Sequence, residues 1–146
     1  VDQLRELPGV EVTGYVPDVR PWLARATVAV APLRIAAGVQ TKVLEAMASA
    51  LPVVTTARAL RGLTPAVHRL IVTAETPSEL TDAVVQLLTD PVGARRRGLA
   101  ARAGVIAEYS WDAALSRLLA HIDSPGLAPR PPLTIPDSST SMATTI

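Results

Sequence analysis

The sequence predicts an α/β fold in which a parallel sheet carries helices on both faces. Short aliphatic runs rich in β-branched residues recur along the chain, and stretches with helical spacing of apolar residues separate them. Most of these runs do not alternate apolar with polar residues, which is typical of strands buried on both faces of a sheet. Alternation of such strands with helices favours a layered fold with a parallel sheet.

Composition supports one domain with an aliphatic core and excludes several classes of site. The chain has 146 residues, of which 49 % are hydrophobic and 3 % aromatic, with a net charge of +1. The near-neutral charge gives no electrostatic case for nucleic acid or anionic lipid, and aromatic platforms for single-stranded nucleic acid are lacking. The chain has no Cys, so thiol nucleophiles and thiolate metal sites are excluded.

Four strands are expected, at residues 10–13, 27–31, 52–56 and 70–72. The chain opens within the end of a helix over residues 1–7, so the sheet looks incomplete. We therefore expect a fragment of a longer protein that lacks the N-terminal strands of its domain.

Helices are expected between the strands and after them. A short helix over 18–25 is capped by Asp18, and another covers 39–50. Thr76 to Glu79 form a capping box, Asp90-Pro91 starts a further helix, and Ser110 caps the last one. Their expected apolar stripes are Val43, Leu44, Met47 and Ala48; Leu80, Ala83, Val84, Leu87 and Leu88; Leu99, Ala103 and Ile106; and Leu115, Leu118, Leu119 and Ile122.

The C-terminal segment over residues 124–146 differs in composition. Five of the 13 Pro residues lie there, followed by a Ser- and Thr-rich end with no apolar period. We expect a disordered, solvated tail; a proline-rich ligand is the alternative.

Residues 38–45 carry the strongest chemical signal. Gly38 removes a side chain before a helix whose first N–H groups, at Val39, Gln40 and Thr41, would favour a phosphate. Lys42 is the only Lys beside 13 Arg, and Glu45 projects on the same helical face. The ammonium would neutralise phosphate, and the carboxylate would accept hydrogen bonds from a ribose diol. A surface ion pair between Lys42 and Glu45 remains the alternative.

These residues resemble the donor-binding segment of group 1 (family 4) glycosyltransferases. The similarity lies in Thr41-Lys42-Val43-Leu44-Glu45-Ala46-Met47-Ala48, then Pro52-Val53-Val54, with flanking matches at residues 12–18, 26–33, 87–91 and 109–111. It covers roughly residues 1–122 in the right order and spacing. The form of the central segment is closest to sugar transferases of bacterial exopolysaccharide loci.

The resemblance implies a Rossmann-like, partial C-terminal domain of a GT-B fold over residues 1–123, which binds a nucleotide sugar. Glu45 matches the second Glu of the family's Glu-x7-Glu motif, which holds the ribose. Gly38 and the amides that follow match the diphosphate-binding turn, and Tyr15 and Val16 match the loop that meets the base. No catalytic residue is assigned.

Two departures from the family's pattern bear on activity. The first Glu of the motif falls on Ala37, and Ala50 stands where a helix-ending Gly is usual. The basic residues of the first strand–helix loop and the acceptor domain are not in this chain. We therefore expect the chain alone to be inactive.

The remaining candidate residues have structural explanations. His68 and His121 have no second ligand at metal spacing, and Arg95-Arg96-Arg97 is interpreted as a solvated helix face rather than an anion reader. Trp111 is expected to pack the last helix against the domain.

The sequence thus predicts the donor half of a retaining, metal-independent hexosyltransferase of glycan or exopolysaccharide synthesis. Its partners would be a nucleotide sugar and the missing N-terminal acceptor domain, with no cofactor, nucleic acid or integral membrane segment. The location would be cytoplasmic, peripheral at the inner membrane face in the full-length enzyme. The alternative is a non-catalytic α/β module that binds nucleotide or a partner protein.

Overall fold

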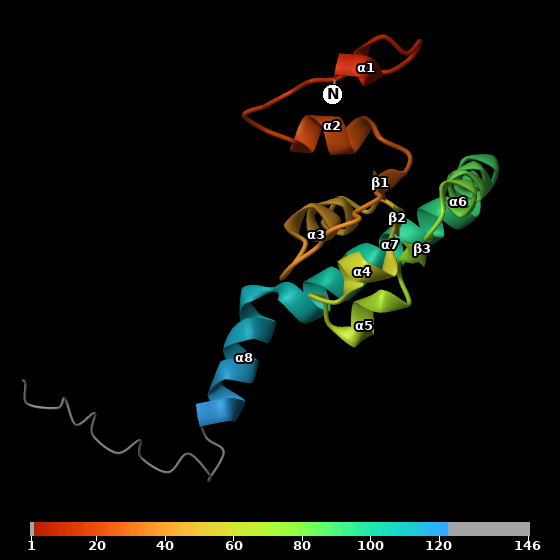
Figure 1. Ribbon diagram of the computed structural model, residues 1–146. Helices are drawn as coiled ribbons and strands as arrows, with labels where there is room; N and C mark the ends of the chain where they lie inside the picture. The colour runs from red at the N-terminus through yellow and green to blue at the C-terminus, as the bar shows by residue number, and fades with distance from the viewer. Residues whose placement is uncertain (1, 123–146) are drawn as a thin grey trace, which may run out of the picture.

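The computed structural model describes residues 2–122, and the expected tail over 124–146 lies outside them. The described chain is an α/β layer structure around a three-stranded parallel sheet (Figure 1). In chain order the elements are α1 (Asp2–Arg5), α2 (Arg20–Arg25), β1 (Ala29–Ala31), α3 (Thr41–Ala48), β2 (Val53–Thr55), α4 (Ala57–Leu60), α5 (Pro65–His68), β3 (Val72–Thr73), α6 (Pro77–Thr89), α7 (Pro91–Tyr109) and α8 (Trp111–Ile122).

The strand order is β1-β2-β3, so β2 is central and every one of its residues is buried. Ala29 pairs with Val53 on one side of β2, and Val54 pairs with Val72 on the other. The buried hydroxyl of Thr55 donates to the Ala31 carbonyl oxygen at 2.6 Å, so even the polar residue of β2 is satisfied inside the sheet.

Helices cover both faces of the sheet, as the sequence predicted. Val53 belongs to a core cluster with residues of α3, α5 and α7, whereas Val54 belongs to a second cluster with Leu87 of α6 and Ala94 at the start of α7. Successive strand residues point to opposite faces, so this split separates the two layers. The prediction of an α/β fold with helices on both faces is confirmed.

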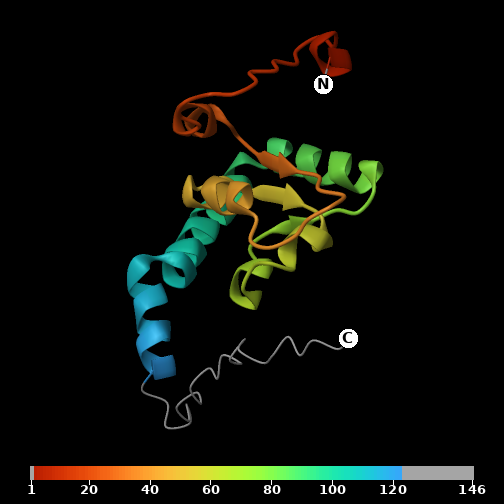
Figure 2. The same ribbon diagram turned by 60° about the vertical axis from the view of Figure 1, so that its left-hand side comes forward.

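The expected strand over residues 10–13 is wrong. This segment is extended but pairs with no strand among the described residues, and most of it is exposed. Figure 2 shows the chain between α1 and α2 running away from the sheet. Alternating apolar residues favour a strand only where a neighbour can take up its backbone hydrogen bonds. The part of the sheet that the structure describes offers no such neighbour to this segment.

The expected apolar stripe of α7 is also wrong. Leu99 and Ile106 are about half exposed, and Ala103 is exposed as well. The residues that face the core are instead Ala94, Gly98, Ala101 and Val105. Small residues let α7 lie close to its neighbours, and the larger side chains are left outside.

The stripes of the other helices are confirmed in part. In α3, Val43 and Met47 are fully buried but Ala48 is exposed, and Ala46 is buried in its place. In α6, Leu87 is buried and Leu88 is exposed.

The last helix does not pack as expected. Ser110 accepts a hydrogen bond from the N–H of Ala113 at 3.2 Å, which confirms the cap. Trp111, however, is 83 % exposed, so the prediction that it packs the last helix against the domain is wrong. The stripe is exposed too, in all of its members, namely Leu115, Leu118, Leu119 and Ile122.

No helix within residues 2–122 has the length and hydropathy of a membrane span.

Candidate functional site at the start of α3

The turn before α3 has the backbone conformation that a close ligand approach requires. Gly38 has φ of +66°, in the left-handed region where Gly is free of strain. The side-chain amide of Gln40 donates to the carbonyl oxygens of Ala37 and Gly38 at 3.1 and 3.2 Å. These two hydrogen bonds stabilise the turn. The Gln40 side chain does not accept a hydrogen bond from the first N–H groups of α3. Those groups stay available to an anion.

A second glycine fixes where this turn lies. A Cβ atom on Gly62, between α4 and α5, would collide with the Gly38 carbonyl oxygen and would lie 2.8 Å from the Val39 nitrogen. The two backbones can touch only because Gly62 carries no side chain. The position of the turn is therefore set by packing against a loop remote in sequence.

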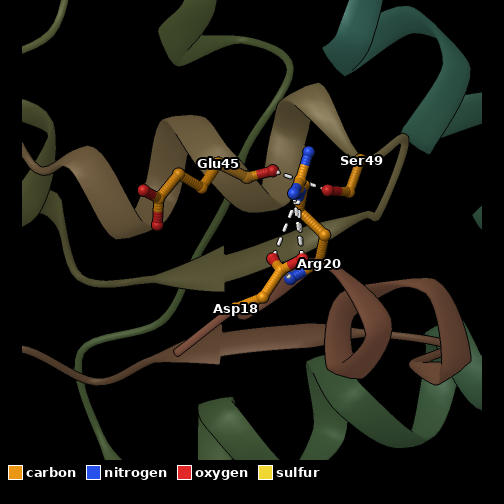
Figure 3. Close-up of polar contacts among 4 residues, drawn as sticks. All are labelled: Asp18, Arg20, Glu45 and Ser49. Carbon is orange, nitrogen blue, oxygen red and sulfur yellow. Dashed lines mark hydrogen bonds and ion pairs between the residues drawn. The ribbon is translucent and has the colours of Figure 1, made fainter. Parts of the chain in front are cut away.

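Lys42 and Glu45 lie exposed on the first two turns of α3, as the helical spacing predicted. Within residues 2–122, neither side chain forms a hydrogen bond or an ion pair, so the alternative of a Lys42–Glu45 ion pair is not realised here. The hydroxyl of Ser49 donates to the backbone oxygen of Glu45 at 2.9 Å, and the carboxylate points away from it (Figure 3). Both charged groups are thus free to meet a ligand.

Two hollows adjoin Glu45. One of about 290 Å³ runs along β1 and is lined by both Lys42 and Glu45. A larger one, of about 590 Å³, lies between α2, α3 and α7, where Arg20 and Arg102 add positive charge. Arg102 donates to the Ala48 carbonyl oxygen at 3.1 Å, which ties α7 to the end of α3.

Arg20 is held by Asp18 beside the larger hollow (Figure 3). The Arg20 Nε lies 2.9 Å from Asp18 Oδ1, and the Arg20 backbone N–H also donates to that carboxylate at 2.9 Å. These side-chain and backbone hydrogen bonds lower the pKa of Asp18, and the same ion pair raises the pKa of Arg20. The prediction that Asp18 caps this helix is wrong, because the N-cap of α2 is Val19 and no side chain makes a cap hydrogen bond there. Asp18 lies one residue earlier, where it accepts the Arg20 N–H and fixes the guanidinium on the rim.

The sequence interpretation missed a polar group at the carboxyl edge of the sheet. Arg34, Thr56 and Glu75 line a hollow of about 140 Å³ beyond the ends of β1, β2 and β3. Glu75 accepts the Ala57 N–H at 2.6 Å, and the Thr56 hydroxyl donates to Leu33 O at 2.8 Å. In open α/β sheets ligands bind at this end of the strands, so polar residues within three positions of each strand end were the available signal.

Tyr15 and Val16 are not brought to the turn. Tyr15 is 91 % exposed, and Val16 is partly buried on the segment between α1 and α2. Neither forms a hydrogen bond with any residue of α3 in the described chain. Their role at a nucleotide base stays a prediction.

Of the two histidines, His68 has a structural role and His121 is exposed. The Nε2 atom of His68 lies 2.9 and 3.0 Å from the carbonyl oxygens of Leu60 and Leu63, which ties α5 to the loop before it. His121 is exposed on α8. Within residues 2–122, no three His, Cys, Asp or Glu side chains cluster as metal ligands would.

Comparison with known proteins gives one result. Residues 1–90 match the family model described as "Glycosyl transferases group 1". No curated protein and no solved structure matches the chain. The match spans the sheet, α3 and the turn before it, and ends before the similarity expected at residues 109–111. This α/β chain, with its left-handed turn and free charges at the start of α3, therefore belongs to the group 1 glycosyltransferases.

Proposed function

We propose that this chain is the donor-binding part of a retaining glycosyltransferase, which moves a hexosyl group from a nucleotide sugar to an acceptor in glycan or exopolysaccharide synthesis. The family match supports glycosyl transfer in general. The observation that carries the donor-binding role is the free pair Lys42 and Glu45 beside the Gly38 turn. The acceptor site would belong to a separate N-terminal domain.

Each element of the turn has a role in this proposal. Gly38 and the N–H groups of Val39, Gln40 and Thr41 would receive the diphosphate at the start of α3. Lys42 would neutralise its charge, and Glu45 would accept hydrogen bonds from the ribose hydroxyls. The base would meet Tyr15 and Val16 once a ligand draws their segment towards α3.

The proposed chemistry needs no metal. Glycosyl transfer places growing negative charge on the departing nucleoside diphosphate, and fixed donors aimed at that charge stabilise the transition state. Lys42 and the N–H groups at the start of α3 would supply that stabilisation. The reaction should therefore continue in the presence of a chelator.

The proposal is tested by substituting Glu45 and Lys42 in the full chain and titrating calorimetrically with UDP, GDP, uridine and guanosine. Glu45→Gln keeps the size of the side chain but removes the charge, so affinity for nucleoside and nucleotide alike should fall about ten- to a hundredfold. Lys42→Ala should weaken binding of the diphosphates more than that of the nucleosides, because its partner is the phosphate.

Matched controls are Glu6→Gln and Arg5→Ala, which remove exposed charges near the N-terminus. Both should leave every affinity unchanged. If Glu45→Gln also leaves the affinities unchanged while circular dichroism shows an intact fold, Glu45 does not hold the ribose and the donor-binding assignment fails.

A non-catalytic nucleotide-binding or interaction module is the second candidate, and Ala37 favours it. A methyl group at Ala37 replaces the carboxylate that the family's motif places against the donor sugar, while the turn beside it is kept. Such a module would bind the nucleotide but show no preference for the sugar-bearing form. Equal affinity for UDP and UDP-glucose, with no sugar release by the full-length protein, would select this candidate.

A further inference from the structure

A group of three arginines lies away from the donor turn, at the amino end of β3. Arg69 follows the last residue of α5, and Arg96 and Arg97 lie near the start of α7. Together the three line a hollow of about 320 Å³. Its remaining lining is Leu70, Gly93 and Ala100, which are small or apolar. We name these three residues, Arg69, Arg96 and Arg97, the arginine triad.

No carboxylate forms an ion pair with the arginine triad in the described chain. The ion pairs within residues 2–122 involve Arg20 and Arg117, and none of the triad side chains forms a hydrogen bond. Asp90 lines the adjoining hollow, but its carboxylate accepts the Gly93 N–H at 2.9 Å as the cap of α7. The hollow thus gathers three guanidinium groups that form no ion pair in the described structure, with the Asp90 carboxylate in the adjoining hollow as a partial counter-charge.

A merely solvated helix face does not explain this arrangement. Solvated faces normally mix both signs of charge, whereas α7 carries four Arg and one acidic residue, Glu108, which lies near its far end and pairs with Arg117. Arg69 adds a third guanidinium from a different element. Converging like charges repel one another, and an anion that binds between them relieves that cost.

We propose that the arginine triad binds a phosphate group, as a site separate from the donor turn. Guanidinium forks match phosphate oxygens in geometry and charge. The donor turn lies beyond the carboxyl ends of the strands, whereas Leu70 of this hollow lies two residues before the amino end of β3. The two sites therefore lie at opposite ends of the strands. The phosphate comes from a soluble anion or from a lipid headgroup, which share this chemistry.

The experiment follows the arginine Nε–H signals of the full chain by NMR during titration with pyrophosphate. Signals of Arg69, Arg96 and Arg97 should shift along one binding curve, and that of the exposed Arg5 should not. In the parent chain, the backbone amide signals of Gly93 and Ala100, which line the same hollow, should shift along that curve as well. The variant Arg69→Gln/Arg96→Gln/Arg97→Gln should abolish these amide shifts. Because all three groups are exposed, the affinity should fall several-fold when salt rises from about 0.05 to 0.5 M. Triad shifts no larger than those of Arg5 overturn the proposal.

Two further arms separate the alternatives. Lys42→Ala should leave the triad shifts intact, so failure of the donor site and failure of the triad are distinguishable. The second arm measures co-sedimentation of the chain with phospholipid vesicles. If the chain sediments with phosphatidylglycerol vesicles but not with phosphatidylcholine vesicles, and the triple variant does not sediment, the phosphate belongs to a lipid headgroup. Binding of pyrophosphate without co-sedimentation identifies a soluble anion.

Discussion

At Ala50 the backbone has φ of +58°, the one positive value for a residue other than Gly within the described chain. The N–H of Leu51 donates to Ala46 O and that of Ala50 to Met47 O, so the left-handed residue closes the end of α3. The resemblance to the family had marked Ala50 as standing where a helix-ending Gly is usual. A Cβ atom in this conformation costs about 1 kcal/mol.

Ala50→Gly should therefore raise the free energy of unfolding by about 1 kcal/mol. The measurement is urea unfolding followed by circular dichroism. Ala48→Gly is the matched control: the same change two residues earlier, inside α3, should lower stability by up to about 1 kcal/mol. Equal effects of both changes would show that Ala50 carries no strain.

Among the elements, α3 and α7 depend on one another through Gly98. A Cβ atom on this residue would collide with the carbonyl oxygen of Ala50 and lie 3.3 Å from the carbonyl carbon of Leu51. Backbone cannot move aside as a flexible side chain can. The absence of a side chain at Gly98 is thus what lets α7 lie against the end of α3.

Gly98→Ala should accordingly destabilise the fold by about 1–3 kcal/mol despite its better helix propensity. In Gly104→Ala the new methyl meets the end of the flexible Leu70 side chain instead. That variant should be close to neutral in a thermal melt. A neutral Gly98→Ala would contradict the close packing of α7 on α3.

The capping box of α6 makes a further contribution, which depends on pH. Glu79 accepts the backbone N–H groups of Glu75 and Thr76 at 2.7 and 3.3 Å, and Thr76 Oγ1 accepts the Glu79 N–H at 3.2 Å. The two backbone hydrogen bonds lower the pKa of Glu79. Its stabilising contribution is therefore present above the ordinary Glu pKa, about 4.3, and is lost as the pH falls through the lowered value.

Thr76→Ala should cost about 1 kcal/mol at neutral pH. Glu79→Gln should destabilise at neutral pH, and its difference from the parent chain should shrink as the pH falls below about 4. Ser78→Ala, in the same turn and exposed, is the control and should change little. Urea unfolding at several pH values measures all three, and a pH-independent difference for Glu79→Gln would exclude the charge as its cause.

Local signals predicted most of the elements but not the short helices α4 and α5, and tertiary context explains the other failures. The starts of the helices at Thr76, Asp90 and Ser110 could be predicted from a few adjacent residues. The partner of residues 10–13 could not, because a strand depends on a neighbour. The inward face of α7 was missed because its packing uses Gly98 and other small residues, which periodicity of large apolar side chains does not reveal. The hollow lined by Arg34 and Glu75 could not be predicted either, because its residues follow three different strands and come together only in the folded sheet.

On the scale of the molecule, much apolar surface is uncovered within residues 2–122. β1 is one of the two edge strands of the described parallel sheet, and Val30 on it is 43 % exposed. The apolar stripe of α8 is more than half exposed in most of its members. Uncovered strand edges and apolar faces promote association.

We therefore expect the purified chain to bind a hydrophobic dye or to aggregate at micromolar concentration. Leu118→Gln/Leu119→Gln should reduce dye binding with little loss of helix content, since both side chains are exposed. Glu11→Gln, an exposed polar exchange, should leave dye binding unchanged. A sharp, reversible melt of a monomer without dye binding would contradict this expectation.

The contact between Gly38 and Gly62 makes the proposed diphosphate turn a shared property of two loops. Any side chain at position 62 would displace the turn from behind, so it would alter nucleotide affinity without ever meeting the nucleotide. The influence also runs in reverse, because a ligand that tightens the turn would restrain the loop between α4 and α5. Engineering a new donor preference here would mean redesigning both loops together, since neither can change shape alone.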